Sequence, residues 1–452
     1  MIVFSIPYHS TEFAKQQKKI AGDLWIEYRL DYLKSLSDFS MELIDNKTII
    51  TIRDILEGGI NFFDFQDKIQ FYKKIIEKYN CLVDLEISNS CEKLNPENLI
   101  LSHHNYQKFD VEELKEIIIK SNELPSKYLK IAVNIEHYSD LLRVQDLINL
   151  STKLVIFVGM GKLGRISRFL YSHLDSIGTY ISNPENQTAT GQIFINEIER
   201  YKILEINKNT QIGGIIGGKQ VEKSLGLEFY NNHFSENLLN AIYLPFVVEN
   251  FEDFWNWLQK SKINFYGFSV TMPFKKIIAS IINNDSTRKL HSVNAFLPKT
   301  NEIFNTDIIA FQKAIKYLNI NNDDKILILG SGGSAEAALE AFKNSKSVFI
   351  SSRNIKKSIQ LAIKYSRNYL NYRELSNFVL INCTPLGMNN EDLLEELNLP
   401  LPRKIIDLPY TDNKTLLIEK GIKNNIPFLG GKMFWEWQSE KQLVLFLDEI
   451  AK

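Results

Sequence analysis

The first half of the chain alternates between short apolar runs and longer helical patterns. Helical patterns, with apolar residues every three or four positions, occur for example at 64–79 and 110–120. Eight β-branched runs with intervening helices favour a parallel (β/α)₈ barrel, and an open doubly wound sheet, which normally uses fewer strands, is the competing interpretation. The runs are IVFSIP (2–7), DLWIEYRLDYL (23–33), KTIITIRD (47–54), CLVDLEIS (81–88), NLILSHH (98–104), YLKIAVNI (128–135), KLVIFVGMG (153–161) and GTYIS (178–182).

A different pattern begins near residue 206. The stretch KILEINKNTQIGGIIGG (202–218) starts a new strand followed by glycine pairs, and another alternating segment ends in a helical pattern at 306–320. A strand, a glycine-rich turn and a helix then follow in DDKILILGSGGSAEAALEAF (323–342). We therefore expect an α/β chain with a barrel at 1–205, a second α/β domain at 206–315 and a nucleotide-binding domain from 316 to 431. The stretch 389–402 is predicted to be the most loop-like part of the chain.

Composition narrows the classes of protein. Of the 452 residues, 44% are apolar and 24% are charged, and the net charge of -1 indicates neither a nucleic acid nor an anionic membrane as partner. The amino terminus has too short an apolar run for a signal peptide, and no run of about 18 apolar residues predicts a membrane span. Cys81, Cys91 and Cys383 are too few and too scattered for a disulfide framework or a zinc site. A cytoplasmic protein without a metal is expected.

Titratable side chains stand where the apolar runs of the barrel stop. In a (β/α)₈ barrel the active site lies at the carboxyl ends of the strands. Any one of these residues is easily explained as a surface group at a strand end, whereas all of them together predict a site. They are Glu27, Arg29, Arg53, Glu86, His103, His104 and Lys130, with Met160 ending the seventh run.

Lys130 is the least expected of these residues, because it begins the apolar stretch Ile131–Val133. An unpaired ammonium is costly to bury, and such a group usually loses its proton. One interpretation is a strand-end lysine with its head in water. The other is an amine that stays uncharged in order to attack a carbonyl. The polar groups on the other strands favour the second.

A glycine motif predicts a dinucleotide site in the second half. Gly330, Gly332 and Ala335 fit G-x-G-x-x-G/A between the strand KILIL and the helix AEAALEAF, and Ser331, Gly333 and Ser334 fill the turn. The first glycine allows the tight turn, and the second lets a pyrophosphate approach the backbone at the helix amino terminus. A plain glycine turn between a strand and a helix is the alternative.

The strand after this motif indicates which dinucleotide is bound. An NAD site carries Asp or Glu about 20 residues on, where it binds the ribose 2′-hydroxyl. Here SSRNIKK (351–357) places Ser352 and Arg353 there, followed by Lys356 and Lys357. Positive charge would attract a 2′-phosphate and favours NADP over NAD, although solvated surface charge also explains the two lysines.

The first half resembles type I 3-dehydroquinate dehydratase in EYRLD, TIRDILEGG, SHHNY, KIAV, GRISR and QTATGQ, in the order of that family. The resemblance implies that Lys130 forms an imine with the substrate ketone and that His104, rather than His103, is the general acid–base. A serine of the family is replaced here by Thr188, which keeps a hydroxyl. The resemblance further assigns Glu57 and Glu86 to orienting or tuning the histidine, Arg29, Arg53 and Arg168 to the substrate carboxylate and hydroxyls, and Glu27, Thr188 and Gln192 to the polar lining.

The second half resembles shikimate dehydrogenase in GFSVTMPFKK, SVNAF, NTD, GSGGSA, INCTPLGM and GGKMFWEWQ. The resemblance implies NADP(H) as cofactor, Lys275 and Asp307 as the catalytic pair, and Lys276 as an ordinary surface lysine. It also implies that the last helix, 432–452, returns to the second domain. Substrate hydroxyls are assigned to Asn294, Thr271 and Gln438, and the nicotinamide side to Thr384 and Gly387.

The dehydrogenase half departs from its family at the substrate loop. Where the family usually reads S-x-S-P, this chain keeps Ser224 but has Gly226 in place of the second serine and Leu227 in place of the proline. These serines normally hold the substrate carboxylate, so one hydroxyl donor is lost. Relatives that accept quinate vary at the second serine. Ala295 and Ile308 are smaller departures that leave the catalytic pair intact.

We therefore expect a bifunctional enzyme that dehydrates 3-dehydroquinate to 3-dehydroshikimate and then reduces that product to shikimate with NADPH. One alternative gives the second half quinate or dehydroquinate as substrate, and another makes it a non-catalytic binding domain. A class I aldolase barrel shares the lysine chemistry but leaves SHHNY and the arginines unexplained. Small molecules are the expected partners, with neither nucleic acid nor membrane, and the barrels of the dehydratase family often form homodimers.

Overall fold

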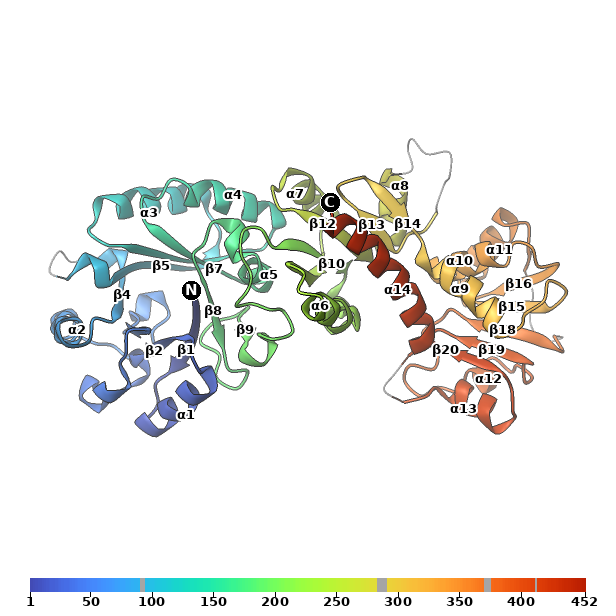
Figure 1. Cartoon of the computed structure of the whole chain (residues 1–452), viewed down its shortest axis with the longest axis horizontal. Coiled ribbons are helices and arrows are strands. Elements are labelled where there is room, and N and C mark those ends of the chain that lie inside the picture. The colour runs from blue at the N-terminus through green and yellow to red at the C-terminus, as the bar shows by residue number, and fades with distance from the viewer. Residues whose placement is uncertain (90–93, 283–290, 370–374, 411–412) are drawn as a thin grey trace. The chain divides into compact units, whose positions relative to one another are not determined.

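The computed structural model describes residues 1–89, 94–282, 291–369, 375–410 and 413–452 (Figure 1). The chain divides into two compact units. The first unit contains Met1–Thr210, Asn231–Leu244 and Val248–Asn264, and the second contains Gln211–Tyr230, Pro245–Val247 and Phe265–Lys452.

A parallel sheet curls round to form the barrel of the first unit. Its strand order is β7-β6-β5-β4-β3-β2-β1-β8-β9, so each neighbouring pair from β1 to β7 is consecutive in the chain. The N–H of Ile177, just before β8, donates to the carbonyl of Val155 on β7 at 2.9 Å and brings the two ends of the sheet together. The strands are β1 (Ile2–Pro7), β2 (Trp25–Arg29), β3 (Thr48–Thr51), β4 (Leu82–Glu86), β5 (Leu99–Lys108), β6 (Tyr128–Asn134), β7 (Leu154–Met160), β8 (Thr179–Ser182) and the short β9 (Ile193–Phe194).

Helices connect most of these strands, and their ends follow the sequence. The carboxylate of Asp64 accepts from the N–H groups of Gln66 and Asp67 and so caps the start of α2, while Asn80 ends that helix in a left-handed conformation. Buried aliphatic side chains from alternate strands fill the interior of the barrel, among them Ile49, Ile100 and Ile156. The helices are α1 (Thr11–Ala21), α2 (Phe65–Tyr79), α3 (Val111–Glu123), α4 (Tyr138–Ile148) and α5 (Gly164–Phe169).

A second sheet follows the barrel, in the order β11-β10-β12-β13-β14. Strands β10 and β12 are parallel, and β13 and β14 are added antiparallel. The last helix, α14 (Gly431–Ile450), returns to this sheet, where the ring of Phe446 packs on Tyr266. The other elements are β10 (Gln211–Gly217), α6 (Gly226–Glu236), β11 (Ala241–Val247), α7 (Phe251–Lys260), β12 (Phe265–Val270), α8 (Lys275–Ile282), β13 (Ala295–Leu297) and β14 (Glu302–Phe304).

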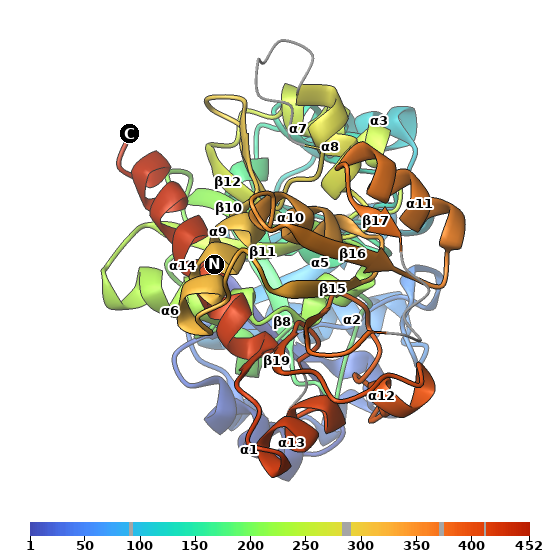
Figure 2. The ribbon, with the colours of Figure 1, turned by 90° about the vertical axis from the view of Figure 1, so that its right-hand side faces the viewer.

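The third sheet is parallel and has helices on both faces (Figure 2). Alternate residues of β15 point to opposite faces: Ile326 and Ile328 pack with α9, α10 and α11, and Leu327 and Leu329 with α12 and α13. Its order is β17-β16-β15-β18-β19-β20, from β15 (Lys325–Leu329), β16 (Ser347–Ser351), β17 (Asn368–Tyr369), β18 (Phe378–Asn382), β19 (Lys404–Asp407) and β20 (Phe428–Gly430). The helices are α9 (Thr306–Tyr317), α10 (Gly333–Ala341), α11 (Ile355–Lys364), α12 (Leu393–Glu396) and α13 (Leu416–Lys423).

The predicted fold class, a (β/α)₈ barrel followed by α/β units with a dinucleotide-binding sheet, is confirmed. Two local predictions were less accurate. The strand expected to begin near residue 206 begins at Gln211, because turns occupy 201–209, and the loop-like stretch 389–402 contains α12, whose start is capped by Asp392. Within the described residues, the search for a helix long and apolar enough to cross a membrane finds none.

Candidate active sites

Lys130 lies in the middle of β6 and is 5% exposed. Its Nζ is 3.0 Å from Oε1 of Glu27 and 3.1 Å from Oδ2 of Asp84, and it lies 4.1 Å from the ring centre of Tyr180. Lys130 is therefore paired with two buried carboxylates and lies on an aromatic face, and is not the unpaired amine that the sequence suggested. Only an unprotonated amine can attack a carbonyl.

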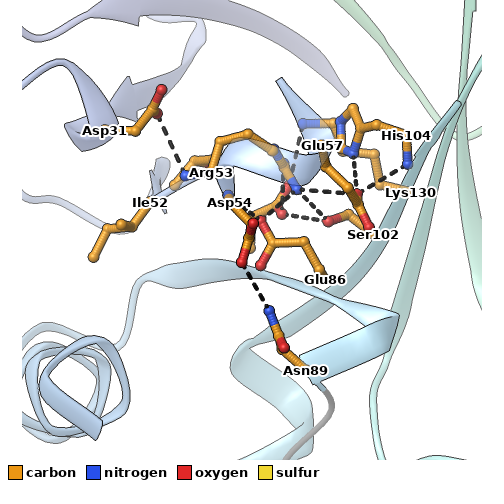
Figure 3. Close-up of polar contacts among 12 residues, drawn as sticks. Asp31, Ile52, Arg53, Asp54, Glu57, Glu86, Asn89, Ser102, His104 and Lys130 are labelled. Carbon is orange, nitrogen blue, oxygen red and sulfur yellow. Dashed lines mark hydrogen bonds and ion pairs between the residues drawn. The ribbon is translucent and has the colours of Figure 1, made fainter. Parts of the chain in front are cut away.

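Arg53 and Asp84 form the centre of the charge network next to this lysine. Figure 3 shows Arg53 close to Glu86 and Ser102. The guanidinium of Arg53 donates to Asp84 at 2.7 Å, to Glu86 at 3.0 Å and to the hydroxyl of Ser102 at 2.7 Å. Burial alone would raise the pKa of Asp84, but Arg53 and Lys130 outweigh it and lower that pKa. Asp84 thus stays ionised beside the amine. Arg53, for which substrate binding stays a prediction, donates to these three groups of the protein.

His104 forms a buried pair with Glu57, the last residue of a short 3₁₀ turn. Nδ1 of the ring and the backbone N–H of His104 both lie 3.0 Å from Oε2 of Glu57 (Figure 3). Burial, together with Arg53 and Lys130, lowers the pKa of His104 well below its usual value, so the ring is neutral. Burial also raises the pKa of Glu57 to about 7, although Arg53 opposes the rise. A neutral imidazole oriented by a carboxyl group is suited to general base catalysis.

The structure distinguishes the two neighbouring histidines and the two glutamates. His103, one residue earlier on β5, points to the opposite side, where Nε2 is 3.7 Å from Glu113 on α3. Glu86, predicted to orient or tune His104, has other hydrogen-bond partners but raises the pKa of Glu57, which contacts the ring. The carboxylate of Glu86 accepts from Arg53, from the backbone N–H of Asp54 at 2.9 Å and from Lys68 at 2.6 Å.

Arg168 on α5 is a buried cation without a carboxylate partner among the described residues. Its guanidinium donates only to the carbonyls of Gly159, Tyr180 and Thr190, at 3.2, 3.0 and 3.4 Å. Burial lowers the pKa of Arg168 to about 9. Such an uncompensated charge favours an anionic ligand, in agreement with the predicted binding of a carboxylate. By contrast, Arg29 is already paired with Asp31 through two hydrogen bonds of 2.8 and 2.9 Å.

These groups surround one cavity in the first unit. Gln192 accepts from the N–H groups of Thr188 and Ala189, and Thr188 donates to Ser5, whose hydroxyl is bonded to Glu27. The cavity therefore brings an amine, an imidazole and a guanidinium within reach of one small molecule. Its lining consists of Glu27, Arg29, His104, Tyr106, Lys130, Ala132, Val158, Met160, Arg168, Tyr180, Thr188, Ala189 and Gln192.

In the second unit, Lys275 and Asp307 form an ion pair. Lys275 is the first residue of α8, and its Nζ lies 2.9 Å from Oδ2 of Asp307 in the first turn of α9. Asn294 donates to the other carboxylate oxygen at 2.9 Å and to Gln438 at 3.1 Å. An amine held by a carboxylate next to amide groups can donate a proton to a developing alkoxide.

Other predicted residues of this site have mainly local contacts. Thr271 donates its backbone N–H to Ile216, and the hydroxyl of Ser224 accepts from the N–H of Gly226 at 3.2 Å. Lys276 is exposed, as a surface lysine is expected to be, and it also pairs with the buried Glu336 on α10.

The glycine loop between β15 and α10 has the geometry expected for a pyrophosphate cradle. Gly330 has φ 118°, and a side chain there would approach the carbonyl of Cys383 to 2.9 Å. At Gly332, the N-cap of α10, a Cβ would meet nothing within 4 Å, so the space in front of the helix is open. The cradle residues Ser331, Gly333 and Ser334 are partly exposed, and Ala335 is buried.

The residues around this loop also fit a dinucleotide phosphate. Ser352 and Arg353 directly follow β16, which neighbours β15, and Arg353 is exposed. Thr384 donates to the Oδ1 of Asn382 at 2.6 Å, and the N–H of Gly387 donates to Glu391 at 3.0 Å. The chain therefore offers an open glycine turn, an exposed cation after β16 and a hydrogen-bonded loop after β18.

Three groups important to the geometry were not found from the sequence: Asp84, Tyr180 and Gln442. Gln442 lies one turn after Gln438 on α14 and contacts Ser269 at 2.5 Å and the carbonyl of Asn294 at 3.0 Å. The four-residue spacing of the two glutamines is the only sequence signal for its role. Cys81 and Cys383 are free thiols, and Cys91 lies outside the described residues. Within the described residues, no cluster of metal-ligating side chains is found.

The fold and the two sites define an α/β protein with a lysine-centred barrel site and a dinucleotide-dependent reductase. Residues 3–208 match the family model of type I 3-dehydroquinase, and residues 216–296 match that of the shikimate dehydrogenase substrate binding domain. The chain belongs to the family that joins these two enzymes.

Relatives with both parts match nearly the whole chain. The bifunctional 3-dehydroquinate dehydratase/shikimate dehydrogenase of Arabidopsis thaliana, a chloroplastic protein, is 25% identical over 95% of this chain and 78% of its own length. The shikimate biosynthesis protein AroDE of Chlamydia pneumoniae is 27% identical over 94% of this chain and 90% of its own. A shikimate dehydrogenase-like protein of Haemophilus influenzae is 32% identical over 45% of this chain and 75% of its own length.

Proposed function

We propose that the chain converts 3-dehydroquinate to 3-dehydroshikimate through an imine on Lys130 and reduces that product to shikimate with NADPH. The observation that carries this proposal is the single cavity lined by Lys130, His104 and the uncompensated Arg168. The test adds 3-dehydroquinate and borohydride and maps the reduced adduct by mass spectrometry. An adduct on Lys130 is expected, and an unmodified Lys130 in an active enzyme would refute the mechanism.

In the dehydratase, Arg168 binds the substrate carboxylate and Lys130 attacks the ketone. The bond from Nζ to the carbonyl carbon forms, water leaves, and the resulting iminium draws electrons from the neighbouring carbon. His104 takes the proton from that carbon, and the protonated ring returns it to the departing β-hydroxyl, which leaves as water. Hydrolysis of the imine releases the product and restores the amine, so the sum is the loss of one water.

The His104–Glu57 pair predicts a pH dependence. The pKa of Glu57 is about 7, so below that pH the carboxyl group is protonated and donates to Nδ1. The proton of the neutral ring then lies on Nε2, and this nitrogen cannot act as a base. Above that pH, the carboxylate accepts from Nδ1–H and leaves Nε2 free as a base. We expect dehydratase kcat to rise through this pH, and Glu57→Gln to remove the inflection and lower the plateau by about 10²-fold. Profiles of kcat against pH measure both effects.

A matched control is Glu113→Gln, since Glu113 pairs with His103 on the outer side of the same strand. Its pH profile is expected to equal that of the parent. An unchanged inflection in Glu57→Gln would contradict the assigned role of Glu57.

In the dehydrogenase, NADPH supplies a hydride to the carbonyl carbon of the substrate when it is bound. The open turn at Gly332 and the cation of Arg353 are the groups that would hold its phosphates. Lys275 donates a proton to the oxygen that becomes a hydroxyl, and Asp307 keeps the ammonium in place. Asn294 and Gln438 orient the hydroxyls of the ring.

Gly226 supports a second candidate, in which this half prefers quinate. It is the first residue of α6 and brings no hydroxyl to the loop where Ser224 stands. We expect Gly226→Ser to lower KM for shikimate by about 10-fold, since a hydrogen bond to a charged group contributes roughly 1.5–3 kcal/mol. Initial rates with shikimate and with quinate measure the effect. Quinate oxidation that outruns shikimate oxidation in the parent would favour the second candidate, and failure to bind NADPH would favour a non-catalytic domain.

The substrates of the chain are small molecules of the shikimate pathway. A homodimer stays a prediction, which sedimentation of the purified protein tests, and so does a cytoplasmic location. The domain limits at 205, 315 and 431 are also proposed rather than measured, and limited proteolysis would locate them.

A further inference from the structure

Lys68 is a buried cation that the mechanism does not yet use. It lies on α2 and is 4% exposed, on the same face as the buried residues Tyr72 and Ile75. Its Nζ is 2.6 Å from Oε2 of Glu86 and 5.9 Å from the ring centre of Tyr72. A lysine is rarely buried unless it is paired, so its position on the core face of a helix indicates a specific function.

An alternating chain of buried charges connects Lys68 to the reactive amine. Glu86 uses Oε2 for Lys68 and Oε1 for Arg53, at 2.6 and 3.0 Å. Arg53 donates to Oδ1 of Asp84 at 2.7 Å, and Oδ2 of the same carboxylate lies 3.1 Å from Nζ of Lys130. All five side chains are at most 6% exposed. In such a row of ion pairs, each charged group changes the electrostatic environment of the next one.

We propose that Lys68 is a positioning residue of the dehydratase, which acts through Glu86 and Arg53 to set the charge balance around Lys130. The inference rests on the proposed function of Lys130. Without Lys68, the single positive charge of Arg53 has to compensate both Glu86 and Asp84. Glu86, which already raises the pKa of Glu57, is then less well compensated, and the inflection that Glu57 gives to the pH profile moves to a higher pH.

Several charged and titratable groups surround Lys130, in the cavity or next to it. They are Glu27 and Arg29 on β2, Arg53 after β3, Glu57 in the following turn, Asp84 on β4, His104 on β5, Arg168 on α5 and Tyr180 on β8. In the row of paired charges, Lys68 stands at the opposite end from Lys130 and does not line the cavity. A substitution of Lys68 therefore leaves the cavity itself unchanged.

The test compares pH profiles of dehydratase kcat/KM in full-length variants. For Lys68→Met we expect the acid limb to move upward by about 0.5–1 pH unit, as one charge at roughly 10 Å does in a partly polar interior. Lys68→Arg, which keeps the charge, is expected to restore the parent midpoint.

Two further variants separate this function from a structural one. Lys74→Met removes an exposed lysine of the same helix and is expected to leave the midpoint unchanged. Lys68→Met/Glu86→Gln removes both charges, leaves no unpaired ion, and is expected to return the midpoint close to that of the parent. If Lys68→Met does not fold, the double variant still decides, because a clearly displaced midpoint in it overturns the inference.

A uniform loss of rate in Lys68→Met at every pH, with an unmoved midpoint, would likewise overturn it. Failure of the proposed function is distinguishable from these outcomes. In that case borohydride would not modify Lys130 even in the parent, whereas failure of the inference alone leaves trapping of the parent intact.

Discussion

Lys130→Met is expected to lower dehydratase kcat by about 10⁴-fold or more and to abolish borohydride trapping, because no other described amine lines the cavity. The loss should be independent of pH, since the nucleophile is absent rather than protonated. The reductase activity of the same chain is expected to stay unchanged, because it depends on Lys275 and Asp307. Formation of 3-dehydroshikimate and oxidation of shikimate, measured on one preparation, test both statements.

Removal of this amine also breaks its buried ion pairs with Glu27 and Asp84, of which Asp84 keeps Arg53 as a partner, and the loss of a buried pair costs about 3–5 kcal/mol. Lys130→Arg separates chemistry from stability, because the guanidinium keeps the charge but cannot form the imine. It should be folded by circular dichroism and still inactive. Lys127→Met, an exposed lysine three residues earlier, is the matched control and should be fully active. Appreciable dehydration by folded Lys130→Arg would contradict the imine mechanism.

Sequence patterns predict the site where the chemistry is local. The glycine turn at Gly330–Ala335 lies between a strand and a helix that are adjacent in the chain, so its geometry follows from a dozen residues. The polar residues at the strand ends of the barrel were likewise predictable, because parallel strands expose their carboxyl ends on one side. Their location on one side of the barrel follows from the fold class alone.

The partners of those residues were not predictable in the same way. Asp84 lies inside an apolar run, and whether its carboxylate reaches Lys130 depends on the register of β4, β5 and β6. Lys68 reads as an exposed position of a charged helix until the packing of α2 is known. Charge networks are set by distances between side chains on different strands, and a pattern along one strand does not contain them.

The partners of two buried arginines, Arg53 and Arg168, could not be predicted for the same reason. The sequence places Arg53 at a strand end, where a substrate donor belongs, yet the neighbouring strands supply Asp84, Glu86 and Ser102 as its acceptors. Arg168, by contrast, meets carbonyl oxygens and no carboxylate among the described residues. The partner atoms of the two arginines therefore differ in a way that the sequence does not show.

Lys275→Met is expected to lower dehydrogenase kcat by about 10²–10⁴-fold, the usual contribution of a general acid. KM for NADPH should change little, because the cradle at Gly332 and the cation of Arg353 lie on other elements. Dehydratase activity should be that of the parent. Steady-state kinetics of shikimate oxidation, with the NADPH dissociation constant from fluorescence titration, measure the separate effects.

Asp307→Asn tests the partner of this lysine. The substitution keeps a hydrogen-bond acceptor but removes the negative charge that lies 2.9 Å from Nζ of Lys275. We expect a smaller loss of kcat than in Lys275→Met, because the amine itself is kept. Lys313→Met, on the exposed side of the same helix α9, is the matched control. Equal activity of Lys275→Met and the parent would show that the proton comes from another group and would remove the ion pair from the mechanism.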